Sequence, residues 1–357
     1  MKIVFTGGGS GGHVIPNLAI IPYLSKEFDE IHYIGSSGIE KEIILKYHGI
    51  TYHEIKCAKL RRSLTLKNLV IPFTVIRGVH MSLKILKDIK PDIIFSKGGY
   101  VAVPVVIAGK MLGIPIIGHE SDISFGLANK IIYKFSTAFC TSFAITAKNR
   151  KKCVVSGSPI RKEILNGNKQ KAITKYHLSS KPTLLVMGGS LGAKKINDSI
   201  FAIAKKLSKT FNIIHITGKG KTNPGIKAQN YIQIEYTDDI PDILSATDIV
   251  LSRAGSNSIF EFACAKIPMI LVPLSKKESR GDQILNAKEF EKLGLATILN
   301  EEDLSDDSLY TTIMSTYKNR KDMIDAINKA HILNGASIIA KMLYKYATEH
   351  YLKNTQK

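Results

Sequence analysis

The sequence predicts an α/β protein made of two doubly wound, Rossmann-like halves. Two glycine-rich turns support this prediction most strongly: Gly8–Ser10 follows the apolar run Ile3–Phe5, and Gly188–Ser190 follows Leu184–Met187. The two turns are separated by about half of the 357 residues, so each opens a half of ordinary domain size. A glycine turn between a strand and a helix is also where such folds hold phosphate groups.

Short apolar runs alternate with helical segments along both halves, which is the pattern of parallel sheets covered by helices on both faces. Helices are expected at Asn17–Ser25, Lys41–Tyr47, Lys194–Ser208 and Gly335–Lys357. The expected strands of the first half are Lys2–Phe5, Ile31–Ile34, Ile93–Phe95, Ile114–Gly118, Ala138–Thr141 and Lys152–Val155. Those of the second half are Thr183–Met187, Asn212–Thr217, Tyr231–Ile234, Ile249–Leu251, Met269–Val272 and Thr297–Leu299.

The composition favours a cytosolic globular protein with anionic partners. The formal net charge is +20 with 44% apolar residues, and no run approaches the roughly 20 apolar residues of a spanning helix. The first apolar run is too short for a signal peptide, and the four cysteines lack metal-site spacing, so we expect reduced thiols. The chain has no tryptophan and no alternation of aromatic and basic residues, which argues against nucleic acid. A diphosphate ligand or an anionic membrane surface fits the charge better.

The first glycine turn satisfies the GxGxxG pattern through Gly7, Gly9 and Gly12, so a dinucleotide site is one hypothesis. Such a site needs an acid at the end of the second strand to hold the ribose, and Ile34–Ser37 supplies none. A nicotinamide-dependent oxidoreductase is therefore a minor alternative. The glycines could also serve a tight turn alone.

His13 directly follows this turn at the expected start of the first helix. A helix N-terminus lowers the pKa of an imidazole, so His13 is a candidate general base. A capping or packing histidine is the alternative.

Further polar residues follow other expected strands, where open α/β sheets place their ligands. Lys97–Tyr100 is a second glycine turn in the first half, and His119–Asp122 follows the run ending at Gly118. In the second half, Ser252–Glu261 is a turn that opens a helix, and Glu261 is placed to hold a ribose diol. A solvated loop and a helix-dipole glutamate are the respective alternatives.

The segment Lys56–Lys90 combines nine lysine and arginine residues with several leucines and only one acid, Asp88. Such a surface suits contact with anionic lipid, although an ordinary pair of helices with solvated lysines is the alternative. The residues expected at the membrane are Arg61, Arg62, Leu64, Leu66, Lys67, Leu69 and Phe73.

Taken together, these motifs resemble the MurG family of bacterial N-acetylglucosaminyltransferases over nearly the whole chain. The stretches that carry the resemblance are GGGSGGHVIPNLAI, FSKGGYVAVPVV, IPIIGHESDISFGLANK, GSPIR, VMGGSLGAKKIN, SRAGSNSIFE and RGDQILNA. Their order along the chain is that of the family.

The resemblance implies a GT-B type fold, in which two Rossmann-like domains face each other across a cleft. Residues 1–160, with a returning C-terminal helix at about 341–357, would bind the acceptor and the membrane, and residues 161–340 would bind UDP-GlcNAc. It implies inverting transfer of GlcNAc to the muramoyl-pentapeptide undecaprenyl diphosphate by a peripheral protein on the cytoplasmic side of the cell membrane. Other cell-wall synthesis proteins are expected partners.

The resemblance also assigns roles to residues. Glu261 would hold the ribose, Ser190 the diphosphate, and His13 would be the base. The implied UDP-GlcNAc-binding set is Ser10, Gly11, Gly12, Asp122, Asn129, Arg161, Ser190, Tyr236, Thr237, Ser256, Asn257, Ser258, Glu261, Asp282 and Gln283. The implied acceptor-diphosphate set is Gly98, Gly99, Tyr100, His119 and Glu120.

The chain departs from the family pattern at two positions: Asp122 stands where many members have asparagine, and Asp282 replaces a glutamine beside Gln283. A carboxylate beside phosphate is unfavourable unless another group offsets it. No DxD-like acidic pair lies beside the proposed diphosphate loop, so we expect neither a metal nor another cofactor in the site. Diacylglycerol glucosyltransferases share part of the GGxxGH pattern and are the nearest alternative enzyme class.

Overall fold

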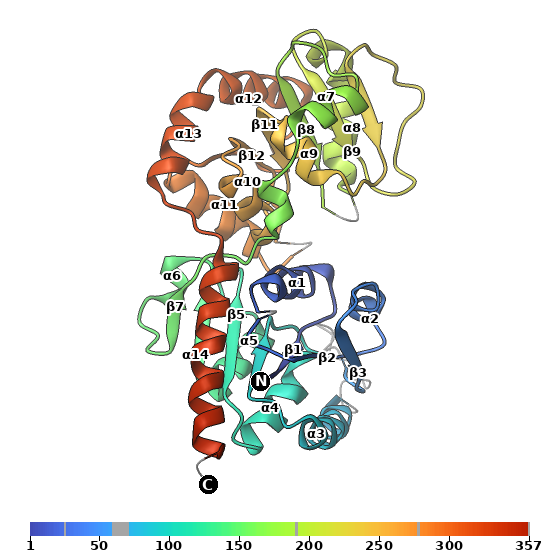
Figure 1. Ribbon diagram of the computed structural model, residues 1–357. Helices are drawn as coiled ribbons and strands as arrows, with labels where there is room; N and C mark the ends of the chain where they lie inside the picture. The colour runs from blue at the N-terminus through green and yellow to red at the C-terminus, as the bar shows by residue number, and fades with distance from the viewer. Residues whose placement is uncertain (25, 59–70, 190–191, 277–278, 356–357) are drawn as a thin grey trace. The chain divides into compact units, whose positions relative to one another are not determined.

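The chain divides into two units in the computed structural model, which describes residues 1–24, 26–58, 71–189, 192–276 and 279–355 (Figure 1). Unit 1 contains Met1–Arg161 and Asn334–Lys357, and unit 2 contains Lys162–Leu333. The chain therefore leaves unit 1 after Arg161 and returns to it at Asn334.

The described part of unit 1 contains one parallel sheet with strand order β3-β2-β1-β4-β5-β6-β7. The order reverses direction between β1 and β4, which makes the ends of these two strands the topological switch point. The strands are β1 (Lys2–Thr6), β2 (Glu30–Gly35), β3 (Ile50–Glu54), β4 (Ile93–Ser96), β5 (Ile116–Glu120), β6 (Ala138–Thr141) and β7 (Cys153–Val155).

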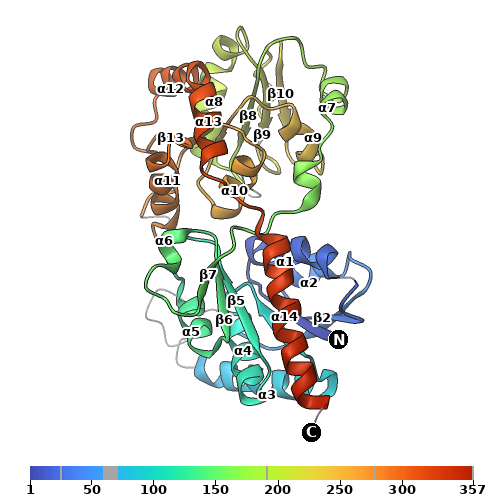
Figure 2. The same cartoon turned by 60° about the vertical axis from the view of Figure 1, so that its left-hand side comes forward.

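Helices pack on both faces of this sheet because alternate strand residues point to opposite sides. Phe5 belongs to the core cluster that α14 completes with Ile339 and Leu343, whereas the neighbouring Val4 packs with residues of α3 and α4. Both views show α14 running along unit 1 (Figures 1 and 2). The helical elements are η1 (Gly11–His13), α1 (Ile15–Ile20), η2 (Ile21–Tyr23), α2 (Ile39–Ile44), α3 (Ile71–Ile89), α4 (Ala102–Met111), α5 (Leu127–Phe135), α6 (Ala144–Ala147) and α14 (Gly335–Thr355).

Unit 2 repeats this topology, with strand order β10-β9-β8-β11-β12-β13 among its described residues and a switch point between β8 and β11. One core cluster joins its strands to α8 and α12 through Ile200 and Ile313. Its strands are β8 (Thr183–Met187), β9 (Asn212–Ile216), β10 (Tyr231–Ile234), β11 (Ile249–Ser252), β12 (Met269–Leu271) and β13 (Ala296–Ile298). Its helices are η4 (Lys162–Leu165), α7 (Lys169–Lys175), α8 (Lys194–Leu207), α9 (Ile240–Ser245), α10 (Ser256–Cys264), α11 (Asp282–Lys292), α12 (Asp306–Lys318) and α13 (Arg320–Lys329).

The structure confirms the predicted fold class, two Rossmann-like α/β units with parallel sheets. Strands β3 and β5 differ most from the sequence prediction. Strand β3 was not predicted, because its residues mix polar and apolar side chains at the sheet edge. Strand β5 begins and ends two residues later than expected, at Ile116 and Glu120. His119 and Glu120 are thus the last residues of a buried strand, and do not lie in a loop after it.

Candidate functional site

Both units place glycine-rich segments at their topological switch points. In unit 1, Gly7–Gly12 follows β1 and Lys97–Tyr100 follows the adjacent β4. In unit 2, the turn that contains Gly188 and Gly189 follows β8, and Arg253–Gly255 follows the adjacent β11. The carboxyl ends of these strands are where open α/β sheets bind ligands.

The first loop of unit 1 orients His13. Ser10 and Gly12 are exposed, Gly11 and His13 are partly exposed, and His13 lies in the short turn η1 ahead of α1. The Ser10 hydroxyl contacts His13 Nδ1 at 2.9 Å. When His13 has its proton on Nδ1, Ser10 Oγ accepts that N–H and Nε2 is able to accept a proton, so this contact is compatible with a base. The carbonyl of His13 also accepts a hydrogen bond from the buried Asn17, at 3.3 Å.

The second loop of unit 1 contacts the first one directly. Gly98 and Gly99 adopt φ angles of +93° and +82°, which favour glycine. A Cβ on Gly99 would lie 2.4 Å from the carbonyl oxygen of Gly8, and one on Gly9 would lie 2.6 Å from the Tyr100 ring. The two predicted loops are therefore packed against each other at the switch point.

The end of β5 supports the second loop with buried polar side chains. Asn129 donates to Glu120 Oε2 at 2.8 Å and to the His119 carbonyl at 3.2 Å. Its Oδ1 has no hydrogen-bond partner, and a Cβ on Gly98 would lie 2.5 Å from that atom. Glu120 also accepts the backbone N–H groups of Asp122 and Gly126. Burial raises the pKa of Glu120, and the charge of Asp122 adds to the effect.

Two further buried groups lie at this end of the sheet. His119 is fully buried and contacts the carbonyl of Gly157 through Nε2 at 3.1 Å. Burial, and then the charge of Lys97, hold the pKa of His119 well below its ordinary value, so the ring is neutral. The Lys97 ammonium donates to the Ser121 hydroxyl. Burial lowers the pKa of Lys97 to about 8, while Glu120 and Asp122 act in the opposite direction.

In unit 2, a pocket of about 420 Å³ brings the glycine-rich turn after β8 together with Gln283. Gly189 and Gly192 have φ angles of +86° and +69°, and a Cβ on Gly192 would lie 2.1 Å from the carbonyl oxygen of Thr217. Gln283 Oε1 accepts the N–H of Leu274 at 3.1 Å. The pocket is lined by Gly188, Gly189, Gly192, Ala193, Lys194, Lys195, Arg253, Leu274, Gln283 and Glu301.

A buried ion pair forms one wall of this pocket. Arg253 Nη2 contacts Glu301 Oε1 at 2.5 Å, and Lys195 contacts the other carboxylate oxygen at 3.2 Å. The side chains of Arg253 and Glu301 are only 10% and 4% exposed. Burial alone would raise the pKa of Glu301, but Arg253, and then Lys195, hold it below its ordinary value.

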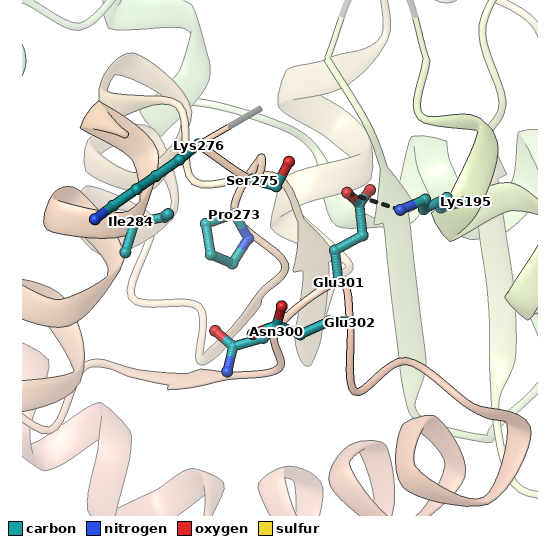
Figure 3. A pocket seen from close by; sticks show the side chains of 8 residues that line it. All are labelled: Lys195, Pro273, Ser275, Lys276, Ile284, Asn300, Glu301 and Glu302. Carbon is teal, nitrogen blue, oxygen red and sulfur yellow. Dashed lines mark ion pairs between the residues drawn. The ribbon is translucent and has the colours of Figure 1, made fainter. Parts of the chain in front are cut away.

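A second pocket of about 440 Å³ shares Lys195 and Glu301 with the first. Figure 3 shows Glu301 pointing towards Lys195, with Lys276 and Ile284 on the opposite side. The remaining lining residues are Pro273, Ser275, Asn300 and Glu302.

The other predicted residues of unit 2 occupy separate elements. Ser256, Asn257 and Ser258 form the first turn of α10, and Glu261 lies in its second turn; none of them lines the Gln283 pocket. Asp282 is the first residue of α11 and pairs with Arg280 at 2.6 Å. Tyr236 and Thr237 follow β10, and Tyr236 is 70% exposed.

The remaining predicted residues lie at the end of a unit, on α3 or outside the described ranges. Arg161 ends the first segment of unit 1, and its buried Nε has no hydrogen-bond partner. Ser190 and the membrane residues Arg61, Arg62, Leu64, Leu66, Lys67 and Leu69 lie outside the described residues. Phe73 is described and is 72% exposed on α3. In the described ranges, no group of three or more His, Cys, Asp or Glu side chains could hold a metal ion. No described helix is long and apolar enough to span a bilayer.

Comparison with known proteins identifies the family. Residues 3–141 match the N-terminal domain of glycosyltransferase family 28, and residues 183–343 match its C-terminal domain. The chain belongs to glycosyltransferase family 28. The sequence resemblance to the MurG family is thereby confirmed, and the chain is a glycosyltransferase.

Several family members are similar over nearly their whole length. A UDP-N-acetylglucosamine–N-acetylmuramyl-(pentapeptide) pyrophosphoryl-undecaprenol N-acetylglucosamine transferase of Clostridium botulinum is 48% identical, covering 98% of this chain and 99% of that protein. Transferase 2 of the same name from Bacillus cereus is 48% identical, covering 92% and 95%. The MurG structure from Acinetobacter baumannii has a TM-score of 0.75 at 23% identity, covering 96% and 99%, and it supports the glycosyltransferase fold.

Arg253, Glu301 and Lys97 make polar contacts beside these glycine-rich loops, and the sequence analysis assigned an individual role to none of them. Arg253 and Lys97 lie within the motifs quoted above, so their positions after predicted strands could have indicated them as site residues. Glu301 looks like part of the solvated acidic run Glu301–Asp303, and only the fold brings it to Arg253.

Proposed function

We propose that the chain is an inverting transferase that moves GlcNAc from UDP-GlcNAc to muramoyl-pentapeptide undecaprenyl diphosphate. The names and full-length similarity of the relatives from Clostridium botulinum and Bacillus cereus support both substrates. The observation that carries the proposal on the structural side is the pocket in unit 2. It combines a glycine-rich turn, the start of α8 and the cationic side chains of Lys194, Lys195 and Arg253, a set that suits a diphosphate.

In the proposed reaction, Nε2 of His13 takes the proton from the acceptor hydroxyl while Ser10 holds Nδ1. The acceptor oxygen then attacks the anomeric carbon from the side opposite UDP, which inverts the configuration. Backbone N–H groups of Gly188, Gly189 and Gly192 would stabilise the departing diphosphate, and the family resemblance implies the same role for Ser190. Glu261 would hold the ribose, and Tyr236 with Thr237 would contact the uracil. Ser256, Asn257 and Gln283 would hold the GlcNAc hydroxyls.

Release of UDP from UDP-GlcNAc, measured with and without the lipid diphosphate acceptor, tests this function. We expect acceptor-dependent release and a loss of about 100-fold or more in kcat for His13→Ala, the contribution of a positioned base. His48→Ala removes an exposed histidine of the same unit and should retain the wild-type rate. Glu261→Ala should raise the KM for UDP-GlcNAc by about tenfold or more, the loss of one charged hydrogen-bonding group. The site assignment fails if both variants keep rates within a factor of about 3.

The acceptor class is tested separately, by offering diacylglycerol in place of the lipid diphosphate. Turnover of diacylglycerol alone would assign the chain to the alternative class of lipid glucosyltransferases.

We also propose that the reaction needs no metal ion, because Lys194, Lys195 and the loop N–H groups supply positive potential beside the proposed diphosphate position. The expected result is an unchanged rate of UDP release in excess EDTA. A loss of activity that Mg²⁺ restores would contradict this part of the proposal.

We propose that unit 1 binds the cytoplasmic face of the membrane through the start of α3. Phe73 and Ile76 are 72% and 66% exposed, and they lie three residues apart on one side of the helix. The exposed residues Arg77, Lys84, Lys87 and Lys90 follow them. Exposed apolar side chains followed by a row of cations suit an interface with anionic lipid.

A further inference from the structure

Glu40 is a fully buried acid beneath the first glycine-rich loop. It lies in the first turn of α2, just after β2, and its side chain reaches back to the loop. Oε2 accepts the N–H of Gly9 at 3.1 Å. Oε1 accepts the N–H of Ser36 at 3.0 Å and also the Ser36 hydroxyl. Two backbone donors and one hydroxyl therefore converge on this carboxyl group.

The surroundings of Glu40 supply no compensating cation. None of the residues that the structure describes forms an ion pair with Glu40. Burial, with a contribution from Glu40, raises the pKa of Tyr33, Tyr52 and Tyr100, and raises the pKa of Cys57 to about 11. These four neighbours are consequently uncharged at neutral pH, and the carboxyl group relies on its N–H and O–H donors.

The contact with Glu40 occupies one backbone N–H group of the first glycine-rich loop. In related folds, the N–H groups of such a loop bind phosphate. Glycine-rich turns hold anions through their backbone N–H groups, and here the N–H of Gly9 is already given to a carboxyl group. A Cβ on Gly8 would lie 2.6 Å from Glu40 Cδ, so the two are in close contact. A second anion placed at this loop would meet the charge of Glu40 at short range.

The second loop of unit 1 differs from the first in having a buried cation beside it, which two acids face. Lys97 precedes Gly98 and Gly99 and is only 2% exposed, and its ammonium group bonds to Ser121. Glu120 and Asp122 face this ammonium group from the end of β5 and the residues after it. A cation thus lies next to the second loop, whereas an acid lies next to the first.

We infer that Glu40 is a positioning residue that fills the anion position of the first loop, holds that loop for His13, and directs the acceptor diphosphate to Gly98–Tyr100. This inference rests on the proposed function for the identity of the acceptor. Because Glu40 is buried and bonded to Gly9, it does not hold a ribose.

Amide signals of the wild-type protein, labelled with ¹⁵N-glycine, test the anion position without any substitution. The donor site is first saturated with UDP, and inorganic diphosphate is then titrated in. We expect shifts at Gly98 and Gly99 and none at Gly9, whose N–H should also exchange slowly with solvent. Shifts at Gly9, or no shift at either loop, would overturn the inference.

Kinetics of Glu40→Gln test the positioning role. The variant should lower kcat about tenfold or more with the UDP-GlcNAc KM within about twofold, since the hydrogen bonds it weakens lie in unit 1. Inorganic diphosphate should become about tenfold or more stronger as an inhibitor competing with the acceptor, because a nearby negative charge is removed. A merely structural role would lower stability without strengthening diphosphate inhibition.

Two matched variants complete the design. Glu42→Gln makes the same charge change on the exposed side of α2 and should behave as wild type. Glu40→Asp keeps the charge but is too short for the same contacts, so it should lower kcat without strengthening diphosphate inhibition. A Glu40→Gln enzyme with wild-type kcat and wild-type inhibition would refute the role. If wild type and Glu42→Gln fail to use the lipid acceptor, the proposed function fails instead, while the amide titration still tests Glu40.

Discussion

Arg253 and Glu301 form a buried ion pair at the wall of the Gln283 pocket, and its removal gives a clear prediction. Glu301→Gln keeps the shape but leaves the guanidinium without its anion, which costs about 3–5 kcal/mol in buried pairs. We expect the free energy of unfolding of the full chain, measured in urea, to fall by this amount in the transition that unfolds unit 2. The exposed neighbour Glu302→Gln should change the free energy of unfolding by less than about 0.5 kcal/mol. Equal effects of the two variants would mean that the pair contributes nothing to stability.

The lowered pKa of Lys97 makes the free energy of unfolding depend on pH in the alkaline range. Its folded pKa of about 8 lies below the ordinary value of 10.5, so between these values the unfolded chain holds a proton that the folded chain lacks. Stability therefore rises with pH across this window, and the cost of burying the charged form is fully present below about pH 8. Relative to Lys97→Met, wild type should gain up to about 3 kcal/mol between the two values.

Urea unfolding of both proteins at several pH values measures this difference, in which the titration of other groups cancels. Lys110→Met removes an exposed lysine from the same unit and should show no such trend. A flat difference between wild type and Lys97→Met would contradict the lowered pKa of Lys97.

At the residue scale, local sequence located the groups that follow strands but not their distant partners. His13 could be named because it follows a glycine turn after a predicted strand, and Gln283 because the family resemblance implies its role. Glu40 could not, because its bond to Gly9 spans 31 positions, and the sequence places it in a helix with no visible link to the loop. Asp122 was flagged as an unfavourable carboxylate, and the structure places it close enough to Lys97 to act on the pKa of the lysine.

At the scale of the element, α14 completes the core of unit 1 from the far end of the chain. Leu343 is fully buried in the same cluster as Ile3 and Phe5, whereas the adjacent Tyr344 is 47% exposed. Leu343→Ala should destabilise unit 1 by about 2–5 kcal/mol, the usual cost of a cavity at a buried leucine. Circular dichroism during urea unfolding measures the loss, and Tyr344→Ala is the control with an expected change below about 0.5 kcal/mol. A small loss at Leu343 would mean that α14 contributes little to the unit.

Most elements follow from hydrophobic patterning, and the exceptions have physical causes. Apolar runs identified Ala138–Thr141 and Thr183–Met187 with the observed bounds, because a strand covered on both faces has no polar side. Strand β3 has intermediate or exposed positions throughout and so lacks this signal. The two-residue shift of β5 arises because His119 and Glu120 are polar yet buried, with their partners in Gly157 and Asn129.

At the scale of the whole molecule, the same topology occurs twice but places different side chains beside the loops. Each unit has its switch point where the strand order reverses, and each places two loops there. In unit 1 the buried side chains of Glu40, Lys97 and Glu120 lie next to these loops. In unit 2 the Arg253–Glu301 pair and Lys195 border the pocket. Sequence symmetry therefore predicted the fold of both units, whereas side chains distant in sequence differentiate the loops.

The net charge of +20 predicts how the whole molecule binds membranes. The protein should bind vesicles that contain phosphatidylglycerol and bind neutral phosphatidylcholine vesicles weakly. Affinity for the anionic vesicles should fall about tenfold or more between 0.1 and 1 M salt, because the screening length shortens from about 10 Å to about 3 Å. Co-sedimentation with vesicles measures both effects.

The apolar part of the contact is separable from the electrostatic part. Replacing Phe73 and Ile76 with serine should weaken the binding that remains at high salt, because apolar burial is not screened. Leu352→Ser, which alters a leucine of α14 that is 50% exposed, should leave binding unchanged. Equal binding to neutral and anionic vesicles, or wild-type binding by the Phe73 and Ile76 double variant, would show that this surface of α3 is not the membrane contact.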